Sequence, residues 1–267
     1  MTILDKIVLH KKNEILESKK VLSLDVLKQH LAVLEPNRSL YRKMGNNSGF
    51  HFICEIKKAS PSKGLLQSNF DPELYARKYE EGGASAISVL TDRKFFQGRP
   101  EYLRLVKRTV ALPVLRKDFI IDSYQIYESK YYGADVVLLI ARLLSKNQLN
   151  DYIDLAGRLN LDVLIEFAEE KDIGKLSQWT KNIILGINNR NLDTFEVDFQ
   201  KSYYLKNKLP DDVPSIAESG IQKGSDCSQL KKWGFGGALI GEALMKSPHP
   251  EELLKQFIKE VESVDRA

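Results

Sequence analysis

Cysteine is scarce in this chain of 267 residues, which contains only Cys54 and Cys227. Two cysteines without a CxxC spacing or a neighbouring histidine cluster favour neither a disulfide framework nor a zinc site. Cys54 lies in an apolar stretch, where a free thiol behaves as a small hydrophobic side chain. We therefore expect a reduced protein that binds no metal.

Long apolar runs and a strong excess of one charge are also absent. No stretch reaches the roughly eighteen apolar residues that a membrane-spanning helix needs. The N-terminal segment MTILDKIVLHKKNEILESKK is interrupted by charge too early for a signal peptide. The net charge is only +4, and the lysines are scattered rather than gathered in the stripe typical of nucleic-acid binders. These absences predict a cytoplasmic protein that binds neither membrane nor nucleic acid.

Eight short apolar stretches recur from residue 52 onward, separated by stretches with helical spacing. They are FICEI (52–56), AISVL (86–90), PVLRK (113–117), DVVLLI (135–140), DVLIEF (162–167), NIILGI (182–187), PSIAES (214–219) and GALIG (237–241). The repeat of roughly 25 to 30 residues has the length of one β–α unit. Nearly continuous apolar strands are typical of a parallel sheet covered on both faces. Eight such units predict an α/β fold, a (β/α)8 TIM barrel. A doubly wound open sheet is the alternative, but no GxGxxG follows the first strand.

Residues 1–48 show helical spacing and no strand pattern, which predicts an N-terminal helical extension before the barrel of residues 49–267. Within it, SLDVLKQHLAVLE (23–35) is expected to form a helix with Ser23 as its N-cap. The stretch NRSLYRKMGNNSG (37–49) is expected to be an irregular linker. We predict a single domain over residues 1–267, although the pattern does not specify where the extension docks.

Polar residues stand at or just after the ends of five predicted strands. Glu55 and Lys57 are two residues apart, so their side chains share one face of the first strand. The same place in other strands is taken by Lys117, Glu166, Asn188, Arg190 and Ser219. One charged residue at a strand end is usually a solvated boundary, but barrel strands converge on one mouth, where active sites of this fold lie. Lysines and glutamates gathered there can supply both an acid and a base.

Two further patterns point to the same mouth. Glycines end the last two strands, in AESGI (217–221) and LIGEALM (239–245), where barrels commonly bind phosphate through backbone N–H groups. Two ordinary glycine turns are the alternative. Phe96, Phe119 and Leu138 could form a flat slot for an aromatic ring, although each alone is equally consistent with core packing. Asp118 is expected at most to orient its neighbour, and the four histidines are assigned no role.

Several of these stretches resemble the indole-3-glycerol phosphate synthase family, and they occur in the family's order. They are EIKKASPSKG, ISVLTDRKFFQG, PVLRKDFIID, GADVVLLIARLL, LIEF, GINNRNL, AESGI and IGEALM. The resemblance implies a monofunctional lyase of tryptophan biosynthesis that uses no metal or organic cofactor. Its substrate would be 1-(2-carboxyphenylamino)-1-deoxyribulose 5-phosphate. Ring closure, loss of carbon dioxide and dehydration of this substrate give indole-3-glycerol phosphate.

The resemblance also implies a role for each matching residue. Lys117 is the implied general acid, Glu166 the general base and Asn188 its positioning group, with Glu55 and Lys57 as further catalytic residues. The residues implied to bind the substrate are Ser60 and Arg190 at the carboxylate and Phe96, Phe119 and Leu138 around the ring. The residues implied at the phosphate are Lys57, Ser219, Gly220, Gly241 and Glu242. Many relatives have Ser in place of Glu242, so its carboxylate is expected to face away and its backbone N–H to bind. A monomer with a small phosphorylated substrate as its partner is expected.

Three other functions remain open from the sequence. Another phosphate-binding barrel, such as phosphoribosylanthranilate isomerase or the tryptophan synthase α subunit, would share the glycine loops but not Glu55, Lys57, Lys117 and Glu166 together. A catalytically silent barrel that binds a sugar phosphate as a regulator would not need an intact acid–base set. A nucleic-acid binder would need clustered basic residues.

Overall fold

The structure is a computed structural model that describes residues 2–31, 36–46, 49–176 and 182–266. Parallel strands close into a barrel in the order β1-β10-β9-β8-β7-β6-β5-β4, and β1 pairs with β4 to complete the ring. The barrel strands are β1 (His51–Ile56), β4 (Ala86–Leu90), β5 (Val114–Lys117), β6 (Val136–Ile140), β7 (Asp162–Phe167), β8 (Ile183–Asn188), β9 (Ser215–Glu218) and β10 (Gly237–Ile240). The predicted (β/α)8 barrel is confirmed, and each predicted strand is present.

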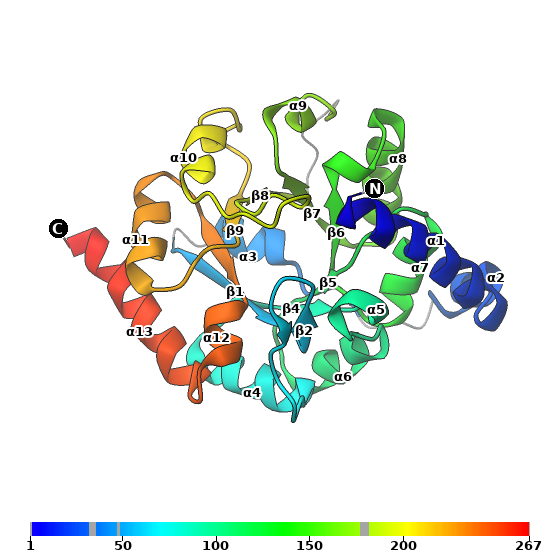
Figure 1. Cartoon of the computed structure of the whole chain (residues 1–267), viewed down its shortest axis with the longest axis horizontal. Helices are drawn as coiled ribbons and strands as arrows, with labels where there is room; N and C mark the ends of the chain where they lie inside the picture. The colour runs from blue at the N-terminus through cyan, green and yellow to red at the C-terminus, as the bar shows by residue number, and fades with distance from the viewer. Residues whose placement is uncertain (1, 32–35, 47–48, 177–181, 267) are drawn as a thin grey trace.

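Helices surround the strands on the outside of the barrel (Figure 1). The helices after the first strand are α4 (Pro72–Gly82), α5 (Arg93–Phe96), α6 (Glu101–Thr109), α7 (Tyr124–Tyr131), α8 (Lys146–Arg158), α9 (Glu170–Ile173), α10 (Gln200–Lys206), α11 (Gly224–Lys232), α12 (Glu242–Lys246) and α13 (Pro250–Glu262). Local signals set several of their ends. The Asp71 side chain accepts two N–H groups at the start of α4, and Gly83 ends that helix with φ at 96°.

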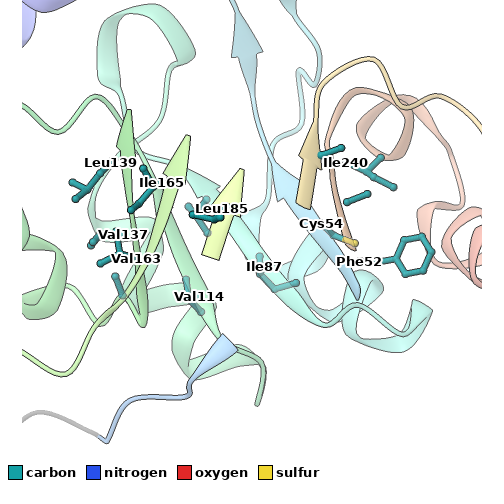
Figure 2. Close-up of a cluster of buried hydrophobic side chains, with 14 of the residues drawn as sticks. Phe52, Cys54, Ile87, Val114, Val137, Leu139, Val163, Ile165, Leu185 and Ile240 are labelled. Atoms are coloured by element: carbon teal, nitrogen blue, oxygen red, sulfur yellow. The ribbon is translucent and has the colours of Figure 1, made fainter. Parts of the chain in front are cut away.

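Alternation along each strand divides its side chains between two cores. One set packs between the barrel and the helices, and Figure 2 shows Phe52, Cys54, Ile87 and Val114 among them. The other set fills the barrel interior and includes Ile53, Ala86, Leu115, Val136, Leu138, Leu164, Ile184, Ile216 and Leu239. In a strand, the residue two positions after an inward-facing residue also faces inward. The side chains of Glu55, Lys117, Glu166 and Glu218 therefore point inward, above the apolar residues of the interior. They lie on β1, β5, β7 and β9, which are every second strand around the barrel.

The N-terminal extension contacts both ends of the barrel. Helices α1 (Ile3–Val21) and α2 (Leu24–His30) form as predicted, and the Ser23 side chain accepts the Val26 N–H as the N-cap of α2. The last four residues of the predicted second helix, 32–35, lie outside the described residues. Near the start of α1, Leu4 and Ile7 are buried against the apolar interior of the barrel.

The prediction of an irregular linker at residues 37–49 is wrong. Residues Leu40–Asn46 form helix α3, in which Leu40 and Met44 lie one helical turn apart and pack on the apolar interior of the barrel. The Asp162 carboxylate, at the start of β7, accepts the Ser39 hydroxyl at 2.9 Å and the Tyr41 N–H at 2.8 Å. The helix therefore forms because it covers the end of the barrel opposite the mouth, a contact that two turns of sequence do not reveal.

The loop after β1 contains an element that the sequence did not predict. Ala59–Ser60 (β2) and Gly64–Leu65 (β3) pair as a short antiparallel hairpin within this loop. Gly64 adopts φ of 66°, a left-handed conformation that glycine reaches without strain. The hairpin gives the loop a defined shape beside the barrel mouth, where Ser60 lines the pocket described below.

Candidate active site

A pocket opens at the carboxyl end of the barrel strands and gathers the predicted residues. The five predicted catalytic residues, Glu55, Lys57, Lys117, Glu166 and Asn188, all line it. So do the predicted substrate-binding residues Ser60, Phe96, Phe119, Leu138, Arg190 and Ser219, together with Glu242. An adjoining hollow, which shares Lys57, Ser219 and Glu242 with the pocket, is lined by the remaining two, Gly220 and Gly241. Residues from all eight barrel strands or the loops that follow them thus meet at one place.

Lys117 lies between two buried carboxylates. Its Nζ is 2.8 Å from Glu166 Oε2 and 2.8 Å from Glu218 Oε2, and each carboxylate is 2% exposed. Burial alone would lower the pKa of Lys117, but Glu166, Glu218 and Glu55 raise that pKa well above its usual value. The side chain is therefore an ammonium at neutral pH, which is the form that can donate a proton.

Glu218 is a residue that the sequence analysis missed. It ends β9, whereas the sequence pattern places the polar end of that strand at Ser219, the next residue. Burial raises the pKa of Glu218 to about 7, against the opposing effect of Lys117 and with a further upward effect of Glu166. The alternation of β9 could have identified it, because Ile216 faces the interior and Glu218 is two residues further on.

Glu55 and Lys57 form the pair that their spacing predicted. Lys57 Nζ lies 2.7 Å from Glu55 Oε1, and both side chains are largely buried. Gly241 leaves room for this pair, because a Cβ at that position would lie 2.5 Å from Glu55 Oε1. The glycine that ends the last strand therefore makes room for the Glu55 carboxylate and also lines the hollow beside it.

The loops around the hollow are fixed by their own contacts. Ser219 and Gly220 both adopt left-handed backbone conformations, with φ of 68° and 78°. A Cβ on Gly220 would lie 2.5 Å from Val197, so the neighbouring loop also requires glycine there. The Glu242 carboxylate lies 2.6 Å from the Lys246 ammonium and 3.8 Å from that of Lys63. The Glu242 carboxylate thus pairs with two lysines at the edge of the hollow.

The pocket has an apolar side made from the barrel and the extension. The rings of Phe96 and Phe119 lie with centroids 6.1 Å apart, and Leu138 contributes from β6. Leu4 and Ile7 of α1 also line this side. Sequence reasoning did not identify them, because helical spacing shows that a face is apolar but not which surface it covers.

The fold and the site together define a (β/α)8-barrel enzyme whose mouth carries an ammonium–carboxylate cluster beside an apolar slot. The model of the family described as "Indole-3-glycerol phosphate synthase" matches residues 4–258. The chain belongs to the indole-3-glycerol phosphate synthase family.

Curated relatives match this chain over nearly their whole length. The relative from Lachnoclostridium phytofermentans is 41% identical over 96% of this chain and 98% of its own. The relative from Ruminiclostridium cellulolyticum is 46% identical over 92% and 94%, and that from Chlorobium chlorochromatii is 43% identical over 95% and 99%. Each of them is named indole-3-glycerol phosphate synthase.

A solved structure of lower identity shows the fold alone. Thiamine phosphate pyrophosphorylase from Pyrococcus furiosus superposes with a TM-score of 0.57 at 17% identity, covering 82% of this chain and 98% of that one. Among the helices of the described residues, none is both long enough and apolar enough to span a membrane.

Proposed function

We propose that this chain acts as an indole-3-glycerol phosphate synthase, a carboxy-lyase of tryptophan biosynthesis. It would convert 1-(2-carboxyphenylamino)-1-deoxyribulose 5-phosphate to indole-3-glycerol phosphate, carbon dioxide and water. The observation that carries the proposal is the Lys117 ammonium, 2.8 Å from the Glu166 carboxylate in a pocket with an aromatic wall and glycine loops. Membership of the family over residues 4–258 supports it.

Lys117 is the proposed acid for ring closure. When the aromatic carbon that bears the carboxylate attacks the ribulose carbonyl, negative charge develops on the carbonyl oxygen. An alkoxide is a stronger base than an amine, so it can take a proton even from a lysine whose pKa is raised. The surrounding carboxylates keep the donor charged until that moment. Loss of carbon dioxide then returns electrons to the ring.

Glu166 is the proposed base for dehydration, in which it removes a proton from the carbon beside the nitrogen in the newly closed ring. The hydroxyl group on the adjacent carbon takes a proton from a lysine of the pocket and leaves as water. Its Oε2 is engaged by Lys117, whereas its buried Oε1 has no hydrogen-bond partner among the described residues. A buried carboxylate oxygen without a partner costs stability, and a bound substrate could supply the missing hydrogen bond. Asn188, whose Oδ1 accepts the Arg190 N–H at 2.9 Å, lines the same pocket and is proposed to position the base and the substrate.

The remaining pocket residues are proposed to bind the three parts of the substrate. Phe96, Phe119 and Leu138 would enclose the ring, and Ser60 and Arg190 would bind its carboxylate. The phosphate would lie in the hollow lined by Lys57, Ser219, Gly220, Gly241 and Glu242. Action as a cytoplasmic monomer, without cofactor, metal or nucleic acid, stays a prediction from the sequence.

Turnover of the proposed substrate is the direct test. The purified chain is expected to produce indole fluorescence from 1-(2-carboxyphenylamino)-1-deoxyribulose 5-phosphate, with equimolar release of carbon dioxide. Binding of inorganic phosphate without turnover would instead support a silent barrel. Consumption of phosphoribosylanthranilate in a parallel assay would support the isomerase.

Gly186→Ala is expected to lower kcat by about tenfold, because displacing a group of the charged cluster by a fraction of an ångström weakens catalysis. Gly186 lies on β8, and a Cβ there would collide with Glu218 Oε1. The collision would move that carboxylate relative to Lys117. Steady-state kinetics on the proposed substrate measure the effect.

Gly157→Ala in α8 is the matched control for this substitution, because the Cβ it would add meets no described atom within 4 Å beyond its chain neighbours and the backbone of its own helix. Alanine also has a higher helix propensity than glycine, so this variant, in the last turn of α8, should keep its activity and its stability. Equal kcat values for Gly186→Ala and the wild type would show that the position of Glu218 does not matter.

A further inference from the structure

A buried lysine outside the pocket joins helix α1 to two loops at the barrel mouth. Lys11 is only 1% exposed, and its Nζ lies 2.8 Å from Asp118 Oδ1 and 2.9 Å from Asp92 Oδ2. Glu14, one turn along α1, is a third partner at 3.1 Å. A buried ammonium is costly unless it is paired, so the ion pairs with Asp92 and Asp118 hold α1 against the barrel.

Asp118 connects Lys11 to the end of β5. Its Oδ1, which contacts Lys11, also accepts the Phe119 N–H at 2.8 Å. Its Oδ2 accepts the Thr91 hydroxyl at 2.6 Å and an Arg116 N–H at 3.0 Å. Asp118 follows Lys117 in the chain and precedes Phe119. The carboxylate that pairs with Lys11 therefore also holds the backbone of Phe119, one of the two aromatic residues of the pocket.

Asp92 connects Lys11 to the other aromatic wall. It is the N-cap of α5, where its Oδ1 accepts the Phe95 N–H at 2.7 Å. Helix α5 is a single turn that ends at Phe96, so its orientation depends on this cap. Phe96 lies 6.1 Å from Phe119, centroid to centroid. One ammonium thus lies between two carboxylates, of which one accepts the Phe95 N–H and the other accepts the Phe119 N–H.

We propose that Lys11 is a positioning residue that sets the spacing of Phe96 and Phe119 by bridging Asp92 and Asp118. The proposal rests on the proposed function, because it assumes that the aromatic ring of the substrate binds beside these two side chains. Its competitor is a purely structural role, in which the cluster only attaches α1 to the barrel. A second ion pair on α1, between Lys19 and Asp122 at 2.7 Å, attaches the helix without touching the pocket and provides the comparison.

Lys11→Met and Lys19→Met, made in the full chain, test the proposal. Lys11→Met is expected to raise KM for the proposed substrate about tenfold and to change kcat less than about threefold, because it disturbs ring binding rather than the acid or base. The inhibition constant of inorganic phosphate should stay at the wild-type value. In the described part of the chain, Lys11, Asp92 and Asp118 do not line the hollow, and their ion pairs and side-chain hydrogen bonds reach no residue that lines it. Lys19→Met should match the wild type in all three constants.

The other outcomes overturn the proposal. An unchanged KM in Lys11→Met with a lowered melting temperature would assign the cluster a structural role only. Parallel changes in KM, kcat and the phosphate constant would indicate a general loosening of the barrel. If Lys11→Met does not fold, Asp92→Asn replaces it, because Asn still caps α5 but removes the charge that faces Lys11. A wild-type KM in that variant would equally reject the proposal. Absence of turnover in the wild-type chain is a separate result, which would reject the proposed function itself.

Discussion

Lys117→Met is expected to lower kcat by about a thousandfold, because it removes the proposed acid of ring closure while keeping a side chain of similar length. Among the predicted changes this is the largest, since Lys117 also neutralises Glu166 and Glu218. Without it, the two buried carboxylates repel each other, and protonation of one of them relieves the repulsion. The variant should therefore still fold, and urea unfolding followed by circular dichroism can verify this. Fluorescence of the indole product measures the loss of turnover.

Lys206→Met is the matched control for this experiment. Lys206 is a largely buried lysine on α10 that pairs with Asp211 at 3.2 Å and does not line the pocket. Its loss should leave kcat near the wild-type value. If Lys117→Met retained turnover within about tenfold of the wild type, Lys117 would not be the acid, because general acids typically contribute a hundredfold or more.

Glu166→Gln is expected to lower kcat by about a hundredfold and to change KM less than about threefold, because a neutral amide keeps the shape but cannot accept the proton. The amide oxygen can still accept a hydrogen bond from Lys117, now 2.8 Å from Glu166 Oε2. Substrate positioning should thus be kept while the base is lost. Steady-state kinetics over a range of substrate concentrations separate the two constants.

Two comparisons make the result for Glu166 specific. Asp172→Asn changes a fully buried carboxylate that pairs with Lys175 at 3.1 Å outside the pocket, and it should leave kcat unaffected. Glu218→Gln changes the other carboxylate that contacts Lys117. A larger loss of kcat in Glu218→Gln than in Glu166→Gln would transfer the role of base to Glu218.

The strands and most site residues could be predicted from the sequence because both depend on local patterns. A strand covered on both faces reads as an apolar run, and its polar end is visible at Glu55, Lys117 and Glu166. The prediction failed where a local pattern was too short or pointed to the wrong residue. Helix α3 has two turns and forms against the barrel end, and the pattern of β9 points to Ser219 where the structure has Glu218 facing the interior.

The sequence by itself determined the barrel and the chemical groups at its mouth, because period-two alternation and the repeat of β–α units are local properties of the chain. Only the tertiary structure decided which of these groups meet. Lys117 contacts Glu166 across 49 positions of sequence and Glu218 across 101, and Lys11 reaches the end of β5 from the extension. These contacts follow from barrel closure and from the burial of α1, which bring distant side chains to ion-pair distance in a place where water does not screen them.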